Sequence, residues 1–352
     1  MKVFALRELI TNQKASFLVV CLRQVLRLAS FPYWVAISVR NLAYGLGLKK
    51  SYRSRLKVIS VGNLSVGGTG KTPTVAWLAQ WLRERDLRVA ILSRGYGQLD
   101  SGQNDEALEL ELLLPDVPHL QHWDRVASAQ LADEELDMQV LLLDDGFQHR
   151  RLARDLDIVL IDASESQLAL RLLPGGLLRE PFSSLRRAQV IIFTRCDQAA
   201  PEAIDALNRH VLHYSPQITI AHASHRPARV DVFASESLSL EELNGKRALA
   251  FCAIGSPGSF FATLTSLGVT LVGQRAWPDH HAYTADDVQQ LIAWTEQTAD
   301  IDLVLCTRKD WVKLQMGKVG RVRLGALVIE LALIEGSEAL ERHVKSVVGT
   351  CE

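Results

Sequence analysis

The chain has 352 residues, of which 48% are hydrophobic and 22% are charged, and its formal net charge is −1 at pH 7. This is ordinary globular composition, and at roughly 150 residues per domain the length corresponds to about two domains. The near-zero net charge points to no acidic or basic partner for the molecule as a whole. Five scattered cysteines without a CxxC pair argue against a disulfide framework or a zinc site and favour a reducing compartment.

The basic charge is concentrated in the first 57 residues. That segment holds eleven Lys or Arg and one Glu, so it carries +10 and leaves −11 for the rest of the chain. Such an asymmetric arm indicates an anionic surface nearby, either a membrane or a nucleic acid. The N-terminus shows no signal-peptide pattern with a cleavage site.

The arm contains one long apolar stretch, Phe17–Val39, interrupted by Arg23, Arg27 and Pro32. We expect no window of about 20 residues to be apolar enough for a spanning helix. The spacing instead predicts an amphipathic helix that lies on a membrane surface with a basic polar face. The alternative is an ordinary amphipathic helix packed on the protein. The apolar positions are Leu18, Leu22, Val25 and Ala29, and the positions opposite are Arg23, Gln24 and Arg27.

After residue 56, short apolar runs alternate with stretches of helical periodicity. The runs are continuous in Val, Ile and Leu, as strands buried on both faces should be. This alternation predicts an α/β fold with a doubly wound parallel sheet. The helix after the first run has Val75, Leu78 and Leu82 on one face. The predicted strands are Val58–Val61, Val89–Leu92, Val140–Leu143, Ile158–Ile161 and Val190–Phe193.

A domain boundary is predicted near residues 224–245, where Ser224–Pro227 and the polar run Ser235–Asn244 lie. The division is then a basic arm at 1–50, a P-loop domain at 51–224 and a smaller C-terminal α/β domain at 225–352. Thr284 with Asp287 forms a capping box for a helix in the last part. The other elements predicted there are strands at Ala248–Ile254, Val269–Val272, Ile301–Cys306 and Ala326–Leu333, and a helix at about Pro257–Leu267.

The strongest local signal is a glycine-rich segment that follows the first strand and opens a helix. Glycines allow consecutive backbone N–H groups to point inward at phosphate oxygens, and the helix N-terminus adds partial positive charge. Lys71 then reaches the β- and γ-phosphates and the Thr72 hydroxyl binds Mg²⁺. One departure from the usual P-loop pattern is Ser65, which stands where the motif normally begins with Gly. The alternative interpretation of the whole segment is a glycine-rich turn before a helix, with Lys71 exposed to solvent. The predicted phosphate-binding residues are Ser65, Val66, Gly67, Gly68, Thr69, Gly70, Lys71 and Thr72.

The strand Val140–Leu143 ends in Asp144 and Asp145. An apolar strand that delivers a carboxylate beside a P-loop is the arrangement that holds Mg²⁺ directly or through water. A strand-ending Asp-Gly turn is the alternative. Asp162, at the end of a neighbouring strand, competes for the metal role, and Asp197 is a weaker candidate for recognising the nucleotide base.

Five segments, in order, resemble the tetraacyldisaccharide 4′-kinase family. The resemblance runs from about residue 57 to 310, and although a P-loop alone occurs in many families, the five together are highly specific. The segments are Val61–Pro73, Ser93–Gly97, Asp144–His149, Leu173–Pro181 (similar to the family's LPAGPLREP) and Trp277–Tyr283 (similar to its FPDHHxY).

This resemblance implies an ATP- and Mg²⁺-dependent kinase that phosphorylates the 4′-hydroxyl of a tetraacyldisaccharide 1-phosphate, giving the 1,4′-bisphosphate (lipid IVA) in lipid A biosynthesis. It implies two Rossmann-like α/β/α domains joined by a short β linker. It also implies a membrane-contacting N-terminal helix and a peripheral location on the cytoplasmic face of the bacterial inner membrane. The alternatives are a P-loop NTPase switch or chaperone and a membrane-bound nucleotide sensor.

The resemblance also implies residue roles. Asp105 accepts the proton of the sugar hydroxyl, His280 pairs with that carboxylate, Glu106 binds nucleotide and Arg179 stabilises phosphate charge. From the residues alone, Asp105 reads as a solvated loop acid, His280 and His281 as surface residues or a metal pair, and Arg179 as a surface arginine. Two departures stand out: the flanks of Asp105 lack the family's Gly and Pro, and Thr307–Asp310 reads TRKD where the family has TEKD.

Overall fold

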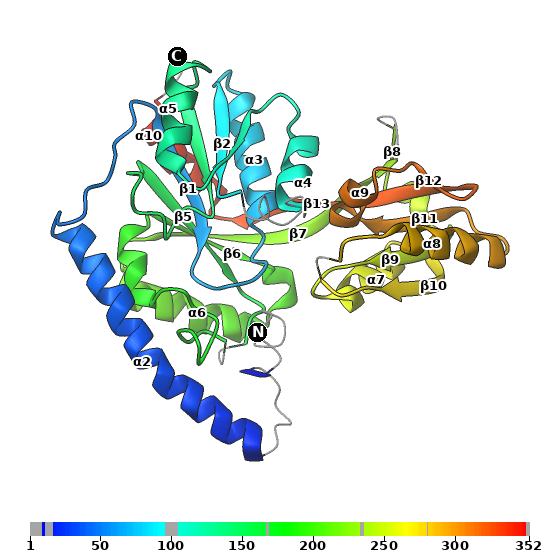
Figure 1. Cartoon of the computed structure of the whole chain (residues 1–352), viewed down its shortest axis with the longest axis horizontal. Helices are drawn as coiled ribbons and strands as arrows, with labels where there is room; N and C mark the ends of the chain where they lie inside the picture. The colour runs from blue at the N-terminus through cyan, green and yellow to red at the C-terminus, as the bar shows by residue number, and fades with distance from the viewer. Residues whose placement is uncertain are drawn as a thin grey trace. The chain divides into compact units, whose positions relative to one another are not determined.

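The computed structural model describes residues 9–10, 17–95, 105–166, 169–232, 236–279 and 281–349. The chain forms two compact units that interleave along the sequence (Figure 1). The P-loop unit comprises Met1–Gly95, Leu114–His225 and Leu331–Glu352. The second unit comprises Tyr96–Leu113 and Arg226–Glu330.

The P-loop unit is built on a parallel sheet with strand order β7-β6-β5-β1-β4-β2-β3. Val61 lies opposite Asp144 and Asp162 opposite Thr194, so the carboxyl ends of these strands meet at one edge. All five strands predicted here are confirmed. The bounds are β1 Lys57–Asn63, β2 Val89–Ser93, β3 His119–Gln121, β4 Val140–Asp144, β5 Leu156–Asp162, β6 Val190–Thr194 and β7 Thr219–Val232.

Helices cover the sheet of the P-loop unit. On α3 (Lys71–Arg83), which packs on β1 and β4, the predicted inner face of Val75, Leu78 and Leu82 is fully buried. Besides α3 and the N-terminal helix, the described helices of this unit are α5 Arg125–Glu134, α6 Pro201–Tyr214 and α10 Ser337–Val348, with short 3₁₀ turns η1 Phe182–Arg187 and η2 Cys196–Gln198.

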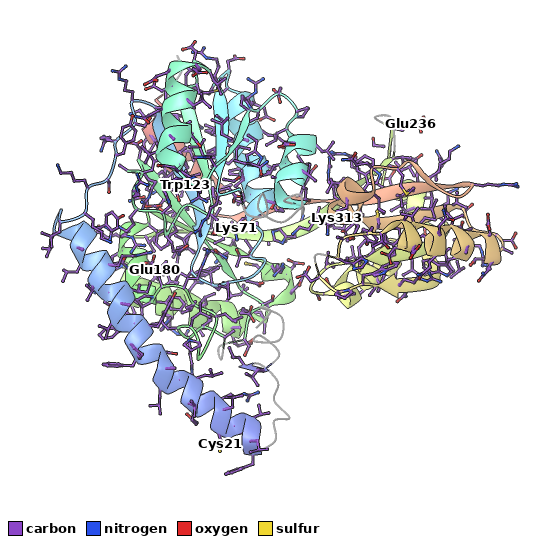
Figure 2. All side chains as sticks on the ribbon, viewed as in Figure 1. Cys21, Lys71, Trp123, Glu180, Glu236 and Lys313 are labelled. Carbon is purple, nitrogen blue, oxygen red and sulfur yellow. The ribbon has the colours of Figure 1, made fainter. Side chains whose placement is uncertain are left out.

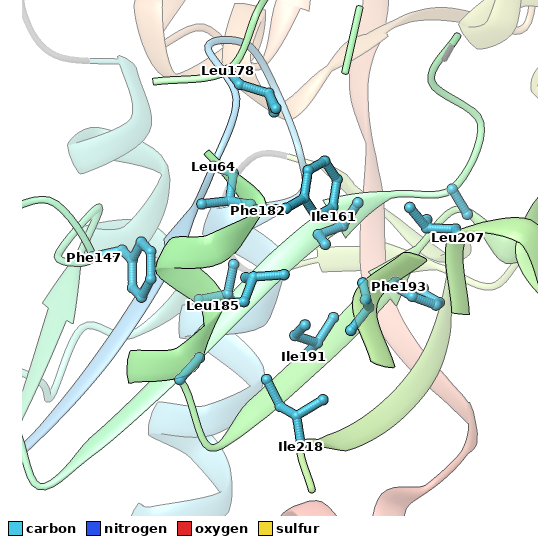
Figure 3. Close-up of a cluster of buried hydrophobic side chains, with 14 residues drawn as sticks. Leu64, Phe147, Ile161, Leu178, Phe182, Leu185, Ile191, Phe193, Leu207 and Ile218 are labelled. Carbon is cyan, nitrogen blue, oxygen red and sulfur yellow. The ribbon is translucent and has the colours of Figure 1, made fainter. Parts of the chain in front are cut away.

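A buried apolar cluster fixes the segment that leads into η1 (Figure 3). Phe182 and Leu185 of η1 pack with Ile191 and Phe193 of β6 and with Leu207 of α6. Each such side chain contributes about 1.5–3 kcal/mol on full burial. The residues immediately before η1, including Arg179, are therefore attached to a rigid core.

The second unit has a four-stranded arrangement in the order β10-β9-β11-β13, and the β10–β9, β9–β11 and β11–β13 pairs are parallel. The predicted strands and helix are present, and Thr284 and Asp287 form the predicted capping box. The helix α4 (Asp105–Leu113) packs on α9 (Arg308–Leu314). The remaining bounds are β8 Glu236–Leu238, η3 Glu241–Leu243, β9 Arg247–Cys252, α7 Pro257–Ser266, β10 Thr270–Ala276, α8 Ala285–Gln297, β11 Leu303–Thr307, β12 Lys318–Val319 and β13 Val322–Glu335.

Two long strands, β7 and β13, each contribute to both units. Ser224–Pro227, which the sequence indicates as part of a boundary, lies inside β7. The change of unit therefore takes place within a continuous strand: Val190 and Ile191 of β6 pair with its first residues, and β8 pairs with its last.

The N-terminal helix α2 (Phe17–Gly45) is continuous over 29 residues and passes through Pro32 (Figure 1). By length and composition it can cross a membrane, which corrects the expectation that no segment qualifies. Its exposed side is apolar, whereas polar residues such as Ser30 and Tyr33 face the P-loop unit. In an ordinary packed amphipathic helix the apolar face turns towards the protein and the polar face towards solvent, so the two faces of α2 are reversed. The exposed apolar residues are Phe17, Leu18, Val20, Leu22, Val25, Leu28, Phe31, Trp34, Val35, Val39 and Leu42.

Candidate functional site

The glycine-rich loop joins β1 to α3 and is held from beneath by two strand ends. The Asn63 side-chain amide donates to Thr69 Oγ1 (2.8 Å), and Thr194 Oγ1 donates to the Thr69 carbonyl (3.0 Å). Gly67 and Gly70 have φ values of 120° and 86°, which residues other than glycine rarely adopt. Lys71 is the first residue of α3, and Thr72 beside it is buried. The result is a fixed backbone cradle at a helix N-terminus, suited to phosphate.

His225 lies against this loop and is a residue that the sequence analysis missed. A Cβ added to Gly70 would lie closer than 3.0 Å to two atoms of the His225 ring. Within the described part of the chain, its buried Nε2 has no hydrogen-bond partner. Burial, assisted by the charge of Arg195, lowers the pKa of His225 to about 4, so the ring is neutral at pH 7. His225 lies at the loop because β7 ends its pairing with β6 beside the carboxyl ends of β5 and β6.

Asp145 follows β4 and forms the electrostatic centre of the site. Its carboxylate accepts two hydrogen bonds from the Arg179 guanidinium (2.7 and 2.8 Å), and Lys71 Nζ lies 3.9 Å away. Burial alone would raise the pKa of Asp145, but the Arg179 hydrogen bonds and the Lys71 charge outweigh it and hold the pKa at about 2. The same guanidinium also donates to the side-chain oxygen of Asn63. Two cations and one carboxylate thus face the start of α3.

Asp144, the last residue of β4, is 7% exposed and lies one position before Asp145. Asp162, the competitor, is ion-paired with Arg195 and accepts hydrogen bonds from Ser164 N (2.9 Å) and Oγ (2.6 Å). Arg179 occupies the Asp145 carboxylate in a similar way, so partner occupancy does not separate the two candidates, and the metal role of Asp144 and Asp145 stays a prediction. Among the described residues no three His, Cys, Asp or Glu side chains gather as a metal site. The oxygen donors of Thr72, Asp144 and Asp145 suit Mg²⁺ shared with phosphate oxygens.

The acceptor-side predictions fall largely outside the described residues. His280 is outside them, and so are residues 96–104, which precede Asp105. Asp105 and Glu106 open α4, and only their backbone is described. The neighbouring His281 is described: its Nε2 lies 3.0 Å from Asp287 Oδ2. Hydrogen bonds from Thr284 and His281 lower the pKa of Asp287. His281 is thereby fixed to the first turn of α8.

The TRKD segment forms the N-terminus of α9, capped by Thr307. The Arg308 side chain is 7% exposed and forms an ion pair with Asp231 (2.7 Å). Asp310 is fully buried and accepts hydrogen bonds from the Tyr283 hydroxyl (2.9 Å) and the Ala253 N–H (3.0 Å). Asp310 therefore connects the segment after β10 to the end of β9, and Arg308 connects α9 to β7.

The chain is similar to known proteins of one family over most of its length. The family model described as LpxK, tetraacyldisaccharide-1-P 4′-kinase, matches residues 22–349. A tetraacyldisaccharide 4′-kinase of Geobacter metallireducens is 38% identical over 344 residues, covering 92% of this chain and 98% of the relative. One from Anaeromyxobacter dehalogenans (strain 2CP-1) is 36% identical over 336 residues, covering 90% and 88%. The crystal structure of LpxK from Aquifex aeolicus in complex with ATP has a TM-score of 0.75 and 31% identity, covering 93% of this chain and 100% of that one.

Proposed function

The chain belongs to the tetraacyldisaccharide-1-phosphate 4′-kinase family, and we propose that it transfers the γ-phosphate of ATP to the 4′-hydroxyl of a tetraacyldisaccharide 1-phosphate. The product is the 1,4′-bisphosphate, lipid IVA, of lipid A biosynthesis. The observation that carries the proposal is the cradle at the start of α3, faced by Lys71 and by the Asp145–Arg179 pair.

In this reaction, residues of the P-loop unit hold the triphosphate of ATP. Backbone N–H groups of Ser65–Thr72 surround its oxygens, and Lys71 and Arg179 supply positive charge where negative charge develops. Asp145 lies against both cations and holds the Lys71 and Arg179 side chains at the start of α3. Thr72, Asp144 and Asp145 would hold Mg²⁺, which would offset phosphate charge when bound.

On the acceptor side, Asp105 takes the proton of the sugar hydroxyl as that oxygen attacks the γ-phosphorus in line, and ADP leaves. His280 orients the Asp105 carboxylate, and Glu106 contacts the nucleotide. Because phosphoryl transfer depends mainly on positioning and charge, each loss is expected to be large, on the order of 10²–10³-fold per electrostatic donor.

The test is a transfer assay with labelled ATP, Mg²⁺ and detergent-dispersed tetraacyldisaccharide 1-phosphate. We expect label on the lipid with the wild-type protein, and nearly none with Lys71→Ala or Asp105→Ala although both retain wild-type circular dichroism. Phosphate release without lipid labelling would indicate an NTPase switch instead, and nucleotide binding without turnover would indicate a sensor. Wild-type rates in either variant would remove that residue from the mechanism.

For the location, we propose peripheral attachment to the cytoplasmic face of the inner membrane through α2 and the basic arm. The support is the outward apolar face of α2 and the +10 charge of residues 1–57. Binding to anionic vesicles should weaken with salt, because such attraction is screened over about 10 Å at 0.1 M. Leu28→Ser/Phe31→Ser should reduce vesicle binding, whereas Trp123→Ser, on an equally exposed residue elsewhere, should not. Equal binding by the two variants would contradict the assignment.

A further inference from the structure

The polar side of α2 contacts two adjacent residues, Arg179 of the phosphate site and Glu180. The Tyr33 hydroxyl donates to the Arg179 carbonyl (2.9 Å). Arg40 Nη2 pairs with Glu180 Oε1 (3.0 Å), and the Asn41 side-chain amide donates to Glu180 Oε2 (2.9 Å). Figure 2 shows Glu180 beside α2. Three side chains of one helix thus bind one dipeptide.

The contact continues along the preceding loop. Ser30 Oγ donates to the Leu172 carbonyl (2.9 Å) and accepts from the Gly175 N–H (3.0 Å). A Cβ on Gly175 would lie 2.8 Å from the Arg27 Cα, so the loop and the helix backbone are in close contact there. The helix therefore holds the loop from residue 172 to residue 180 at several points.

The opposite side of this loop is bonded to the phosphate cradle. The Val66 N–H donates to the Leu177 carbonyl (2.8 Å), and the Arg179 N–H donates to the Leu64 carbonyl (2.6 Å). The Arg179 side chain then reaches Asp145 and Asn63. The loop consequently lies between α2 and the cradle, and a displacement of α2 acts directly on Arg179, whose carbonyl is bonded to Tyr33.

Glu180 is the buried anchor of this layer. It is fully buried and also accepts from Arg187 (2.9 Å). Burial would raise the pKa of Glu180, but the charge of Arg187 and the hydrogen bonds from Asn41 and Arg187 lower it, so the carboxylate stays ionised. Removing a partner from a buried carboxylate is strongly destabilising, and α2 supplies two of the partners of Glu180.

We propose that Tyr33, Arg40 and Asn41 are positioning residues for Arg179, so that α2 supports the phosphate site through the loop 172–180 as well as forming a lipid-facing surface. This inference rests on the proposed kinase function. The physical reason is that an arginine serving phosphoryl transfer must be held in place: a misplacement of about 1 Å costs up to ~10²-fold in rate. A helix that served only as an anchor would not need a hydrogen bond to the backbone of that arginine.

The experiment uses the full-length protein with detergent-dispersed lipid, so that membrane recruitment does not limit the rate. Tyr33→Phe/Asn41→Ala removes the hydrogen bonds to the Arg179 carbonyl and to Glu180 while it keeps the Tyr33 ring, and it should lower kcat about tenfold, with the KM for lipid changed less than twofold. Tyr44→Phe is the matched control, because it removes a hydroxyl from the same helix where the ring packs on Arg150. It should keep wild-type kcat. Thermal unfolding establishes that each variant is folded.

A double-mutant cycle distinguishes positioning from general damage. In an Arg179→Ala background, adding Tyr33→Phe/Asn41→Ala should have little further effect, because the group that it positions is gone. Wild-type kcat in Tyr33→Phe/Asn41→Ala, or losses that multiply fully with Arg179→Ala, would overturn the inference. The affinity for Mg-ATP is measured in parallel and should fall about fivefold in Tyr33→Phe/Asn41→Ala but not further in the Arg179→Ala background. If the wild type never labels lipid, the function fails, while the affinity cycle still decides the positioning role.

Discussion

Gly70→Ala is the substitution for which the structure gives the sharpest expectation. Gly70 caps α3 with φ 86° and ψ 27°, and a methyl group there would meet the His225 ring inside 3.0 Å. Left-handed backbone costs a side-chain-bearing residue about 1–2 kcal/mol. Overpacking against a buried ring costs about 1–3 kcal/mol more. Gly70→Ala should therefore lower the free energy of unfolding by roughly 2–5 kcal/mol.

The two contributions separate because only the second involves His225. Removing the ring in Gly70→Ala/His225→Ala should restore the overpacking part and leave the backbone part. The coupling energy between the two substitutions should thus be about 1–3 kcal/mol, beyond what independent sites show. The affinity for Mg-ATP should fall in Gly70→Ala and recover in part in Gly70→Ala/His225→Ala, since a displaced loop no longer directs its N–H groups at phosphate.

Urea unfolding of the wild type, both single variants and the double variant measures the cycle. Gly68→Ala is the matched control in the same loop, because an added Cβ there meets no atom within 4 Å. Its stability should stay close to that of the wild type. A coupling energy of zero within about 0.5 kcal/mol would refute the inferred contact between His225 and the loop.

Three further predictions concern charges and caps. Asp145→Asn should lower the stability of the nucleotide-free protein at pH 7 by about 2 kcal/mol, because the pKa of Asp145 is depressed from 3.8 to about 2. A carboxylate whose pKa is depressed in the folded protein stabilises the fold at every pH above its unfolded pKa. The higher free energy of unfolding of the wild type should therefore persist down to about pH 4 and shrink towards pH 2 in urea titrations; equal stability of the two proteins at pH 7 would contradict the prediction. Arg308→Glu should cost about 3–5 kcal/mol by placing like charge against Asp231 in a buried site, whereas Arg323→Glu, at an exposed pair, should cost under about 1 kcal/mol; similar costs would show that burial is not decisive. Thr284→Ala should cost about 1 kcal/mol by removing the α8 cap, measured by thermal unfolding, and an unchanged midpoint would argue against the capping box.

The sequence predicts the strands and the phosphate loop well for identifiable physical reasons. Strands buried on both faces, such as Val58–Val61 and Val190–Phe193, must be continuously apolar, and that pattern is local. The loop is also local, because strand, glycines, Lys71 and helix follow one another directly. The acidic end of β4 is placed beside the loop by parallel pairing with β1, which the βαβ rhythm implies.

Other features depend on contacts between distant segments, which local patterns do not record. No local pattern in the sequence indicates that residues 96–113 belong to the second unit and residues 331–352 to the P-loop unit. His225 comes to the loop through a strand whose mixed polar and apolar residues hide its strand character. The periodicity of α2 is readable, but which face turns outward is decided by its polar bonds to residues 172–180.

The reversed charge in the TRKD segment is explained within the second unit itself. Arg308 lies against Asp231, whose other oxygen accepts from Arg229 (2.7 Å), and the charge of Glu109 on α4 also acts on the Arg308 side chain. An arginine facing acidic residues from two other elements is a compensated substitution, since an isolated buried charge would be expelled. Arg308 begins α9, on which α4 packs, and Glu109 lies one helical turn after Asp105. The departure from the family pattern therefore has a local explanation: acidic residues of β7 and α4 hold Arg308, and α4 is the helix that begins with the proposed catalytic acid.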